Sequence, residues 1–538
     1  MTDSPAVDST AVDSAVPDST ASDSPMPAGA ARPRVVMLVA NGVAGDSRVQ
    51  KIAWSMAAAG WAVTLVGRAA GGEVERFRLG AADVVLVPVP TTVSGYERVR
   101  LRGGHRAAEL RSAYRDARAE LAARDASASG RLRSKASAAI RARLAAHPRA
   151  DGIVEHAASG PIGGGARMLL GTALGLADRY GGWRWLNPWF GDLELALAPV
   201  VRDLDPDLIH AHDFHMVGIG ARLAATLSTP TRSVRWIYDA HEYLRGIEVP
   251  SPVDVRARMR RRMLVGVERE YIRRADAVVT VSRGIAAKLA EDHRLAVRPF
   301  VILNAPVIAP QPTRSARSLR ADCGVGPEVP LLLYSGGMSP RRGVVTAVEA
   351  LSGLPDVHLA LIAREEDPDV SKLTRRAIEL GVIDRLHVVP YVPVDQVVPY
   401  ISSATVGLIP ILHLPNHELS LITKYFEYLH AALPIVTSDV REMAAHTRKL
   451  GVGEVFTAGE ADSLVTAVRL VLADLGRYRA VYEGPDDPRA DSSWAGQASR
   501  LDALYSEVLG VRPGPARPAG DLELVPVQPI SQPLARVP

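Results

Sequence analysis

Short runs of apolar residues alternate along the chain with stretches in which apolar side chains recur at helical spacing. The first run, at 34–40, is continuously apolar after its first residue, which is typical of a strand buried on both faces of a parallel sheet. A glycine-containing loop follows, then a helical pattern at 49–59 and a second apolar run at 62–66. This order predicts the βαβ unit of a doubly wound sheet.

Two further cycles of the pattern follow. Apolar runs bounded by polar residues resume after residue 200 and again after residue 330, with helical stretches between them. Such sheets bind ligands at the carboxyl ends of their strands. The sequence therefore predicts an α/β chain whose two Rossmann-like domains face a cleft, with strands at 207–210, 234–238, 277–281, 331–335, 357–362, 386–389, 405–409 and 433–437.

Changes in composition divide the chain into predicted segments. Asp-Ser dipeptides recur every five residues near the start, and proline is frequent near the end. Too little large apolar surface is present there to offset the entropy of ordering. The predicted segments are a disordered acidic tail at 1–31, an N-terminal domain at 32–308, a linker at 309–320, a C-terminal domain at 321–490, a helix at 491–510 that packs back on the first domain, and a disordered Pro-rich tail at 511–538.

Residues 96–190 interrupt the alternation and are predicted to form a helical, basic insertion in the first domain. Residues 96–150 hold fourteen Arg or Lys against five Asp or Glu, whereas the first thirty residues hold five acids and no base. These balances of +9 and −5 account for the whole formal charge of +4. Two hypotheses stay open for the insertion: a solvated helical face, or peripheral contact with anionic lipid or an acidic partner. Nucleic acid is not expected, because the following tryptophans do not interleave with the arginines.

Cysteine content and hydropathy exclude several classes of protein. One cysteine, Cys323, permits neither an internal disulfide nor a cluster of this chain's own thiolates on a metal, and it fits a reducing compartment. No apolar run approaches the roughly 18 residues of a spanning helix, and the first residues lack the pattern of a secretory signal. We therefore expect a cytoplasmic protein, with the insertion as the candidate for contact at the inner face of a membrane.

The first domain carries polar residues where predicted strands end. Gly42 and Gly45 would let the backbone approach a ligand, and Arg48 near a helix start could meet an anion, although two such glycines serve packing about as often. In the extended run His-Ala-His-Asp at 210–213, the histidines share a face and Asp213 points the other way, which favours a hydrogen-bonding surface for a polyol over a metal site. After the next strand, His241 is either a sugar-hydroxyl contact or a histidine satisfied by a backbone carbonyl.

The second domain carries charged residues at matching positions. Arg342 lies in a glycine-containing turn, and Lys424 and Glu427 are three apart on one helical face. One interpretation is a simple ion pair. In the other, Arg342 and Lys424 hold a diphosphate from two sides and Glu427 accepts the two ribose hydroxyls. Tyr391, just past a strand, would either stack on a base or pack in the core.

The order of these motifs resembles that of the retaining glycosyltransferases of family 4, which have the GT-B fold. After a buried strand come Gly-Gly-x-x-x-x-Arg-Gly at 336–343, Lys-Tyr-Phe-Glu-Tyr-Leu at 424–429 and Leu-Pro-Ile-Val at 433–436. The similarity covers roughly 34–95 and 200–505.

The resemblance implies that the two domains have different tasks. The second domain would bind a nucleotide diphosphate sugar as co-substrate and the first an acceptor. Transfer would retain the anomeric configuration and need neither a metal nor another cofactor. The resemblance also places His212 and Asp213 on the acceptor side and His241 close to the reacting carbon.

Two departures from the family pattern concern the sugar donor. Gly336 and Gly337 stand where the family has Gly-Arg, and Arg342 replaces the usual lysine. The family's first glutamate would fall on residue 419, which is a leucine. Either Glu418 or the backbone amides around Ser420 and Leu421 take its place.

These observations predict a metal-independent, hexosyltransferase-like enzyme of carbohydrate biosynthesis, with His241, Arg342 and Lys424 as its catalytic residues. Its acceptor would be a glycan, a lipid-linked molecule or a small molecule. Two alternatives remain. One is a sugar-nucleotide epimerase, for which Glu418 is the loose candidate for acid and base, and the other is a non-catalytic protein that binds a sugar nucleotide.

Overall fold

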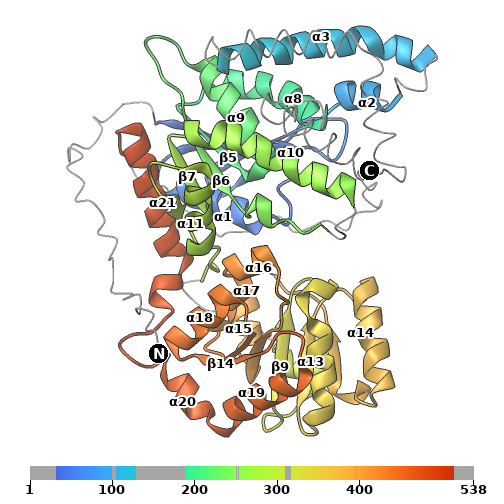
Figure 1. Ribbon diagram of the computed structural model, residues 1–538. Helices are drawn as coiled ribbons and strands as arrows, with labels where there is room; N and C mark the ends of the chain where they lie inside the picture. Colours follow the sequence, from blue (N-terminus) through green and yellow to red (C-terminus); the bar gives the residue numbers. More distant parts are fainter. Residues whose placement is uncertain are drawn as a thin grey trace, which may run out of the picture.

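The computed structural model contains two α/β units, each built on one predominantly parallel sheet (Figure 1). This architecture confirms the predicted pair of Rossmann-like domains. The structure describes residues 32–99, 105–128, 188–249, 251, 254–308, 317–393 and 396–513. The predicted acidic tail, most of the linker, nearly all of the Pro-rich tail and the larger part of the insertion lie outside these residues.

The first sheet has the strand order β3-β4-β2-β1-β5-β6-β7-β8, and each neighbouring pair is parallel except β3 with β4. The apolar pattern did not indicate the antiparallel edge, because most residues of β3 are exposed. The strands are β1 (Arg34–Leu38), β2 (Ala62–Arg68), β3 (Glu75–Leu79), β4 (Ala82–Val87), β5 (Leu208–His212), β6 (Arg235–Ala240), β7 (Ala277–Thr280) and β8 (Phe300–Val301).

The second sheet has the order β11-β10-β9-β12-β13-β14 and is parallel throughout. Its central strands are buried along their length, which explains why their sequences are apolar without alternation. The strands are β9 (Leu331–Ser335), β10 (His358–Ile362), β11 (Leu386–Val389), β12 (Val406–Ile409), β13 (Ile435–Ser438) and β14 (Gly453–Phe456).

Each sheet has a point where the direction of winding reverses. β1 lies between β2 and β5, and β9 lies between β10 and β12. Ligands of open α/β sheets bind in the crevice that such a reversal leaves beyond the carboxyl ends of the strands. The loops after β1, β5, β9 and β12 are therefore the places to look for a site, and they include the predicted glycine loops and the His-Asp segment.

Helices cover both faces of each sheet, and an apolar cluster fills each of the four layers between sheet and helices. The α-helices are α1 (Ser47–Ala58), α2 (Thr92–Val99), α3 (His105–Ala128), α8 (Pro188–Leu204), α9 (Asp213–Leu227), α10 (Val255–Tyr271), α11 (Arg283–His293), α12 (Leu319–Cys323), α13 (Val344–Ala350), α14 (Pro368–Glu379), α15 (Val397–Ile401), α16 (Pro415–Leu419), α17 (Thr423–His430), α18 (Arg441–Leu450), α19 (Ala461–Ala473), α20 (Leu475–Ala480) and α21 (Trp494–Leu509).

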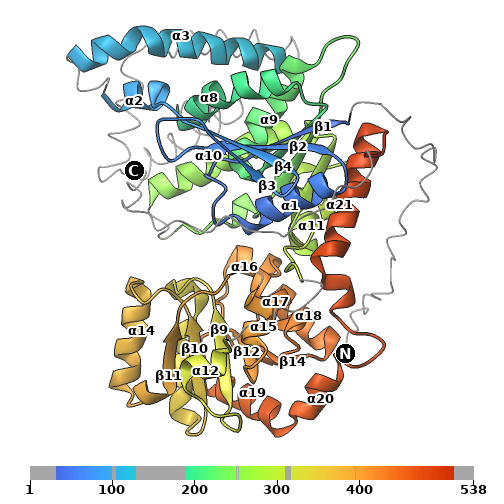
Figure 2. The same ribbon diagram turned by 180° about the vertical axis from the view of Figure 1, so that it is seen from behind.

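The last helix, α21, returns from the second domain and lies along the first (Figures 1 and 2). Trp494 and Tyr505 are buried in the core of the first domain beside α1. Trp494 Nε1 donates to Ser55 Oγ at 2.8 Å, and Trp61 Nε1 donates to Asp502 Oδ1 at 2.7 Å. The first domain is thus completed by residues that follow the second in sequence.

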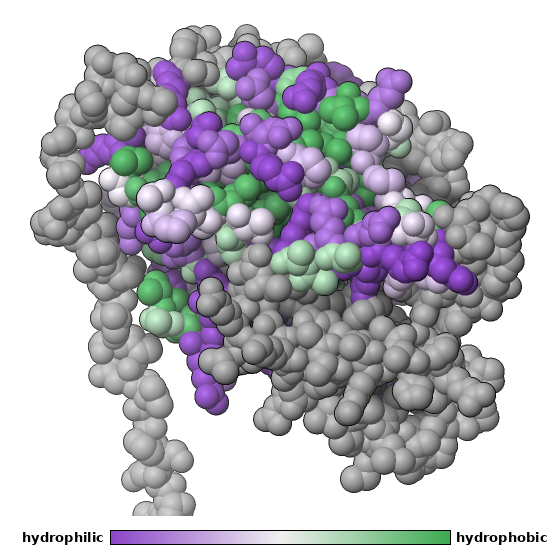
Figure 3. Space-filling model, turned by 90° about the horizontal axis from the view of Figure 1, so that it is seen from above, coloured by the Kyte–Doolittle hydropathy of each residue, from purple (hydrophilic) through white to green (hydrophobic). Residues whose placement is uncertain are grey.

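The described parts of the insertion are helical. α3 lies on the side of the first domain that faces away from the second domain (Figures 1 and 2), and its Arg111 and Arg115 are exposed. Seen from above, hydrophilic and hydrophobic residues are interspersed on the described part of this face (Figure 3). Membrane contact through the insertion stays a prediction. Among the described residues, no helix is both long and apolar enough to cross a bilayer.

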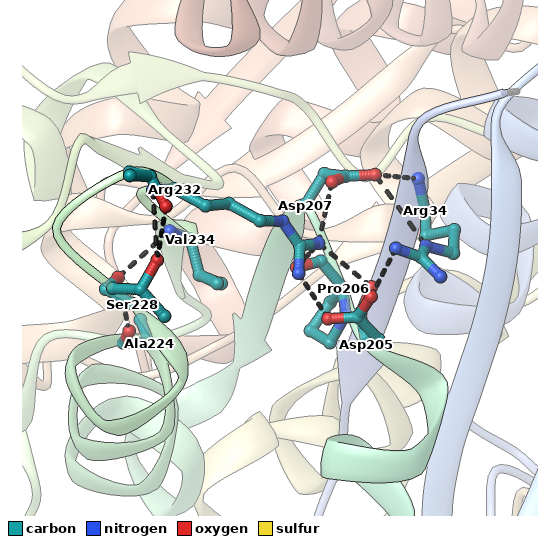
Figure 4. Close-up of polar contacts among 10 residues, drawn as sticks. Arg34, Asp205, Pro206, Asp207, Ala224, Ser228, Arg232 and Val234 are labelled. Carbon is teal, nitrogen blue, oxygen red and sulfur yellow. Dashed lines mark hydrogen bonds and ion pairs between the residues drawn. The ribbon is translucent and has the colours of Figure 1, made fainter. Parts of the chain in front are cut away.

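Charged residues fix the amino end of the first sheet, opposite the loops named above (Figure 4). Asp207 accepts a hydrogen bond from the backbone N–H of Arg34 at 2.8 Å and another from Arg232 Nη2 at 2.8 Å. The side chain of Arg34 also pairs with Asp205. These groups are partly exposed, so the ion pairs add little stability, but the bond to the Arg34 backbone fixes the start of β1 beside β5.

Candidate functional site

Arg342 and Lys424 lie on two elements of the second domain, close enough for their charges to interact. Arg342 ends a 3-10 turn after β9, and Lys424 lies in the first turn of α17. The Lys424 side chain is 9% exposed, and its Nζ lies 3.3 Å from Tyr334 Oη and 4.4 Å from the centre of that ring. Burial, followed by the charge of Arg342, lowers the pKa of Lys424 to about 7.

No described residue pairs with the Arg342 guanidinium. This side chain is half-buried. Two cations close enough to perturb each other, one buried and one unpaired, are unfavourable unless an anion joins them. Their arrangement favours the binding of an anion with several negative oxygens.

The glycines of the β9 loop form one wall of this site. Gly336 has φ +121°, and a Cβ placed on it would lie 2.6 Å from Lys424 Nζ. Gly343 has φ +64°, and a Cβ there would lie 1.9 Å from the carbonyl oxygen of Pro410. Gly337 is exposed and has open space beside it. The loop thus brings its backbone directly against the ammonium, and side chains at positions 336 and 343 would prevent this.

Glu427 lies one helical turn after Lys424. Burial raises the pKa of Glu427, and the nearby charges of Lys424 and Lys51 act against that shift. No hydrogen bond joins the Glu427 carboxylate to another described residue, so both oxygens can accept from a ligand. The structure places this carboxylate between lysines of both domains, whereas the sequence indicated only Lys424. The ribose contact itself stays a prediction.

Tyr391 and the 418–421 segment have different surroundings. Tyr391 is 49% exposed just past β11, so the core-packing alternative is wrong, and its stacking on a base stays a prediction. The amide of Ser420 already donates to His417 O, which leaves Leu421 as the backbone candidate. Glu418 bonds His413 Nδ1 through one oxygen, and through the other it accepts from the Arg441 amide at 2.8 Å. Its two oxygens thus bind the loop before α16 and the first residue of α18.

Arg48 meets an anion inside the protein. Its guanidinium is 4% exposed, and its Nε and Nη2 each donate to one oxygen of Asp239 at 2.9 Å, while Nη1 donates to Ile302 O at 2.8 Å. The prediction that Arg48 faces the acceptor is therefore corrected, because the first turn of α1 and the end of β6 bring this arginine and Asp239 together below the surface. Gly42 and Gly45 lie in the same loop, where Gly45 has φ +77°.

Asp239 is the centre of the first-domain site, and the sequence prediction missed it. His212 Nδ1 and His241 Nε2 lie 3.2 and 3.4 Å from Asp239 Oδ2. Burial would raise the pKa of Asp239, but Arg48 and His241 hold it well below its ordinary value. Burial would lower the pKa of His241, but the charge of Asp239 has the larger effect, so this pKa is raised. The signal in the sequence was the two-residue spacing, since Asp239 lies near the end of β6 and His241 directly follows that strand.

The two histidines of β5 lie behind His241. His210 and His212 have no exposed surface, and their rings stack with centres 4.1 Å apart. His212 is thus enclosed by protein, and its predicted place on the acceptor side stays a prediction. His210, His212 and Asp239 bring potential metal ligands within 4.8 Å of one another. Arg48 already neutralises both oxygens of Asp239, so this group is poorly suited to a cation.

Asp213 reaches the surface beside these buried groups. It has φ +64° at the start of α9, its Oδ1 accepts from the amide of Phe214 at 2.8 Å, and its Oδ2 lies 3.2 Å from His215 Nδ1. The side chain is 28% exposed and interacts with the charge of His241. Asp213 thus stays a candidate for the acceptor side.

The two halves of the site touch through the α16–α17 segment. Asn416 Oδ1 accepts from the amide of Tyr243 at 3.1 Å, and Ser282 Oγ donates to Leu419 O. Lys51 Nζ donates to Asn304 Oδ1 at 2.8 Å, and Asn304 Nδ2 donates to Thr423 Oγ1 at 2.9 Å. The helix that carries Lys424 and Glu427 is therefore attached to α1 of the first domain.

Two sequence families match this chain. The profile of Glycosyltransferase Family 4 matches residues 172–305, and the profile of Glycosyl transferases group 1 matches residues 329–474. The first match spans β5 to β8 and includes Asp239 and His241. The second spans β9 to β14 and includes Arg342, Lys424 and Glu427.

Relatives and solved structures agree with these matches. A 2-deoxystreptamine glucosyltransferase from Streptomyces kanamyceticus is 24% identical over 313 residues, which cover 56% of this chain and 78% of the relative. A sucrose-phosphate synthase from Thermosynechococcus elongatus superposes with a TM-score of 0.58 at 15% identity, over 89% of this chain and 99% of the other. The Anabaena protein HepE, solved in complex with UDP and glucose, superposes with a TM-score of 0.50 at 13% identity. The match covers 88% of this chain and 99% of HepE.

Proposed function

This chain is a glycosyltransferase of the GT-B fold with a family 4 domain and a group 1 domain, and we propose that it transfers a sugar from a nucleotide diphosphate sugar, with retention of configuration, to an acceptor held by the first domain. The observation that carries the donor assignment is the pair of cations at the carboxyl edge of the second sheet: buried Lys424, and Arg342, whose guanidinium no described residue pairs.

A diphosphate satisfies this pair. As the bond between the anomeric carbon and the diphosphate breaks, negative charge grows on the leaving phosphate oxygen, and Arg342 and Lys424 stabilise that charge. Binding also restores the charge of Lys424, because a dianion beside it raises its pKa from about 7. Glu427 accepts the two ribose hydroxyls, and Tyr391, half-exposed at the next strand end, stacks on the base.

The transfer step uses the acceptor hydroxyl as nucleophile. Its oxygen bonds to the anomeric carbon on the face that the diphosphate leaves, and its proton passes to the departing phosphate oxygen. His241, held by Asp239, lies at the sugar and orients it. The chain itself supplies position, charge stabilisation and exclusion of water.

The relatives suggest which substrates to try first. One solved structure contains UDP and glucose, and one relative is named for glucosyl transfer to 2-deoxystreptamine. We therefore take UDP-glucose as the first sugar donor to test and a cyclic polyol as the first acceptor. The epimerase alternative relied on Glu418 as acid and base, and both oxygens of Glu418 are bonded within its own domain.

The decisive experiment combines Lys424→Ala with a transfer assay. Wild-type protein should release UDP from UDP-glucose only when an acceptor is present, and Lys424→Ala should slow transfer roughly 10²- to 10³-fold. Lys449→Ala, an exposed lysine on α18 of the same domain, is the matched control and should keep full activity.

Two results would overturn the proposal. One is full activity of the Lys424→Ala variant while it remains folded. The other is conversion of the nucleotide sugar to an isomer without acceptor. A thermal-shift screen checks the donor independently, since a nucleotide sugar at 100 times its Kd should stabilise the fold by about 2.7 kcal/mol.

A further inference from the structure

A row of side chains extends outward from His241 on the first domain. Asp213 interacts with the charges of His241 and Glu242. His215 pairs with Asp213, and its ring meets the ring of Trp189 edge-on with centres 5.6 Å apart. The row therefore runs from the proposed sugar contact to a half-buried tryptophan through groups on β6, α9 and α8.

Trp189 is held firmly although it lies in the first turn of α8. Glu194 of the same helix forms a buried pair with Arg222 of α9, with Nε donating to Oε2 at 2.9 Å. Asp192 accepts from the backbone amides of Val93 and Ser94 at 2.6 and 3.0 Å. These contacts fix α8 against α9 and against the start of α2, so the tryptophan is preorganised beside His215.

The charges along this row are unbalanced. The charges of Glu242 and Asp213 interact, and no described residue makes a hydrogen bond to the Glu242 carboxylate. Burial, followed by the charge of Asp213, raises the pKa of Glu242 to about 7. The other charged groups around it are His241 on its own strand end and Glu268 and Arg260 on α10. An ammonium between Asp213 and Glu242 would relieve this repulsion.

An aromatic face and carboxylates are complementary to a particular class of molecule. The faces of a carbohydrate or cyclitol ring carry C–H groups that pack on tryptophan, while amines at its edge pair with carboxylates. We propose that the acceptor subsite consists of Trp189, His215, Asp213 and Glu242, an inference that rests on the proposed function. The acceptor is a ring polyol that bears an ammonium group, and its reactive hydroxyl faces His241.

Binding of paired ligands tests this proposal separately from catalysis. Titration calorimetry of the UDP-loaded protein compares 2-deoxystreptamine, which carries two amines, with the neutral ring myo-inositol. We expect the amine to bind at least tenfold more tightly, Glu242→Gln to remove most of that difference, and Trp189→Ala to weaken both ligands. Glu291→Gln, an exposed glutamate on α11, is the control and should behave as wild type.

The pH dependence supplies a second readout. Affinity for the amine should rise between pH 6 and pH 8 as Glu242 ionises, and this rise should disappear in Glu242→Gln. The acceptor assignment is overturned if the amine gives no advantage over myo-inositol, or if Glu242→Gln binds both as wild type does. UDP binding that still depends on Lys424 would then leave the proposed function standing. Binding of anionic vesicles that Trp189→Ala abolishes would likewise overturn the assignment and point to lipid.

Discussion

A lysine ammonium enclosed by protein and next to an arginine has lost most of the hydration that favours its charge in water. Under the proposed function, a bound diphosphate would offset this cost. Gly336 and Gly343 both have positive φ and leave no room for a side chain. A Cβ would collide with Lys424 Nζ at position 336 and with the Pro410 carbonyl at position 343. At the scale of single residues, the second-domain site therefore lowers the stability of the protein without ligand.

Lys424→Met should stabilise the protein without ligand. Because the folded pKa of Lys424 lies near 7, below that of an unfolded lysine, the unfolded chain binds more protons between about pH 7 and pH 10, and wild-type stability rises with pH there. The substitution removes this proton uptake, so we expect a gain on the order of a few kcal/mol at pH 6 that diminishes by pH 9.

Urea denaturation at the two pH values measures this effect. Lys449→Met, on the exposed face of α18, should change stability little at either pH. Loss of stability in Lys424→Met at pH 6 would show that the lysine is stabilising in the empty protein. UDP affinity measured in parallel should fall sharply, which separates stability from function.

At the scale of elements, the short helix α16 joins three parts of the structure. Asn416 and Leu419 contact loops of the first domain, whereas Glu418 faces its own domain. The first turn of α18 receives the Glu418 carboxylate at the Arg441 amide, where an acceptor is favourable. Glu418 therefore caps a neighbouring helix, and its use in place of the family's first glutamate stays a prediction.

Glu418→Ala separates these two roles. The loss of the bond to the Arg441 amide should cost about 0.5–2 kcal/mol of stability, and UDP affinity and turnover at 25 °C should stay close to wild type. Chemical denaturation and the transfer assay together check this. Turnover lowered a hundredfold in a folded variant would instead restore Glu418 as a sugar contact.

At the scale of the whole molecule, two connections couple the domains. α21 crosses from the second domain and fills the core of the first, and Asn304 links Lys51 of α1 to Thr423 at the start of α17. Burial and then Arg48 lower the pKa of Lys51 to about 7, and Glu427 opposes them. The helix that carries Lys424 and Glu427 thus shares a charge network with the first domain, which the sequence pattern did not indicate.

Asn304→Ala should weaken this connection. Lys51 would keep its bond to Ala305 O but lose the Asn304 oxygen, and leaving a buried cation short of a partner costs about 1–3 kcal/mol. Thr423→Val is the matched variant, since it removes one bond to Asn304 and leaves Lys51 satisfied. We expect it to lose less stability in urea denaturation, and equal losses would contradict the role assigned to Lys51.

The sequence alone determined the features that depend on local physics. Continuous apolar runs specify strands buried on both faces, glycines mark the loops where backbone meets ligand, and the three-residue spacing of Lys424 and Glu427 places them on one helical face. These rules act over a few residues, so the two-domain fold and the cations of the second domain could be predicted without coordinates.

Only the tertiary structure decided which distant residues meet. Asp239 pairs with Arg48, which is 191 positions away in the sequence, and Tyr505 bonds His210, which is 295 positions away. Trp189 contacts His215 because α8 packs on α9. The periodicity of the sequence cannot indicate such pairs, because they follow from strand order and helix packing. The sequence therefore indicated the charges and their chemistry, while the fold decided which are buried in ion pairs and which remain available to a substrate.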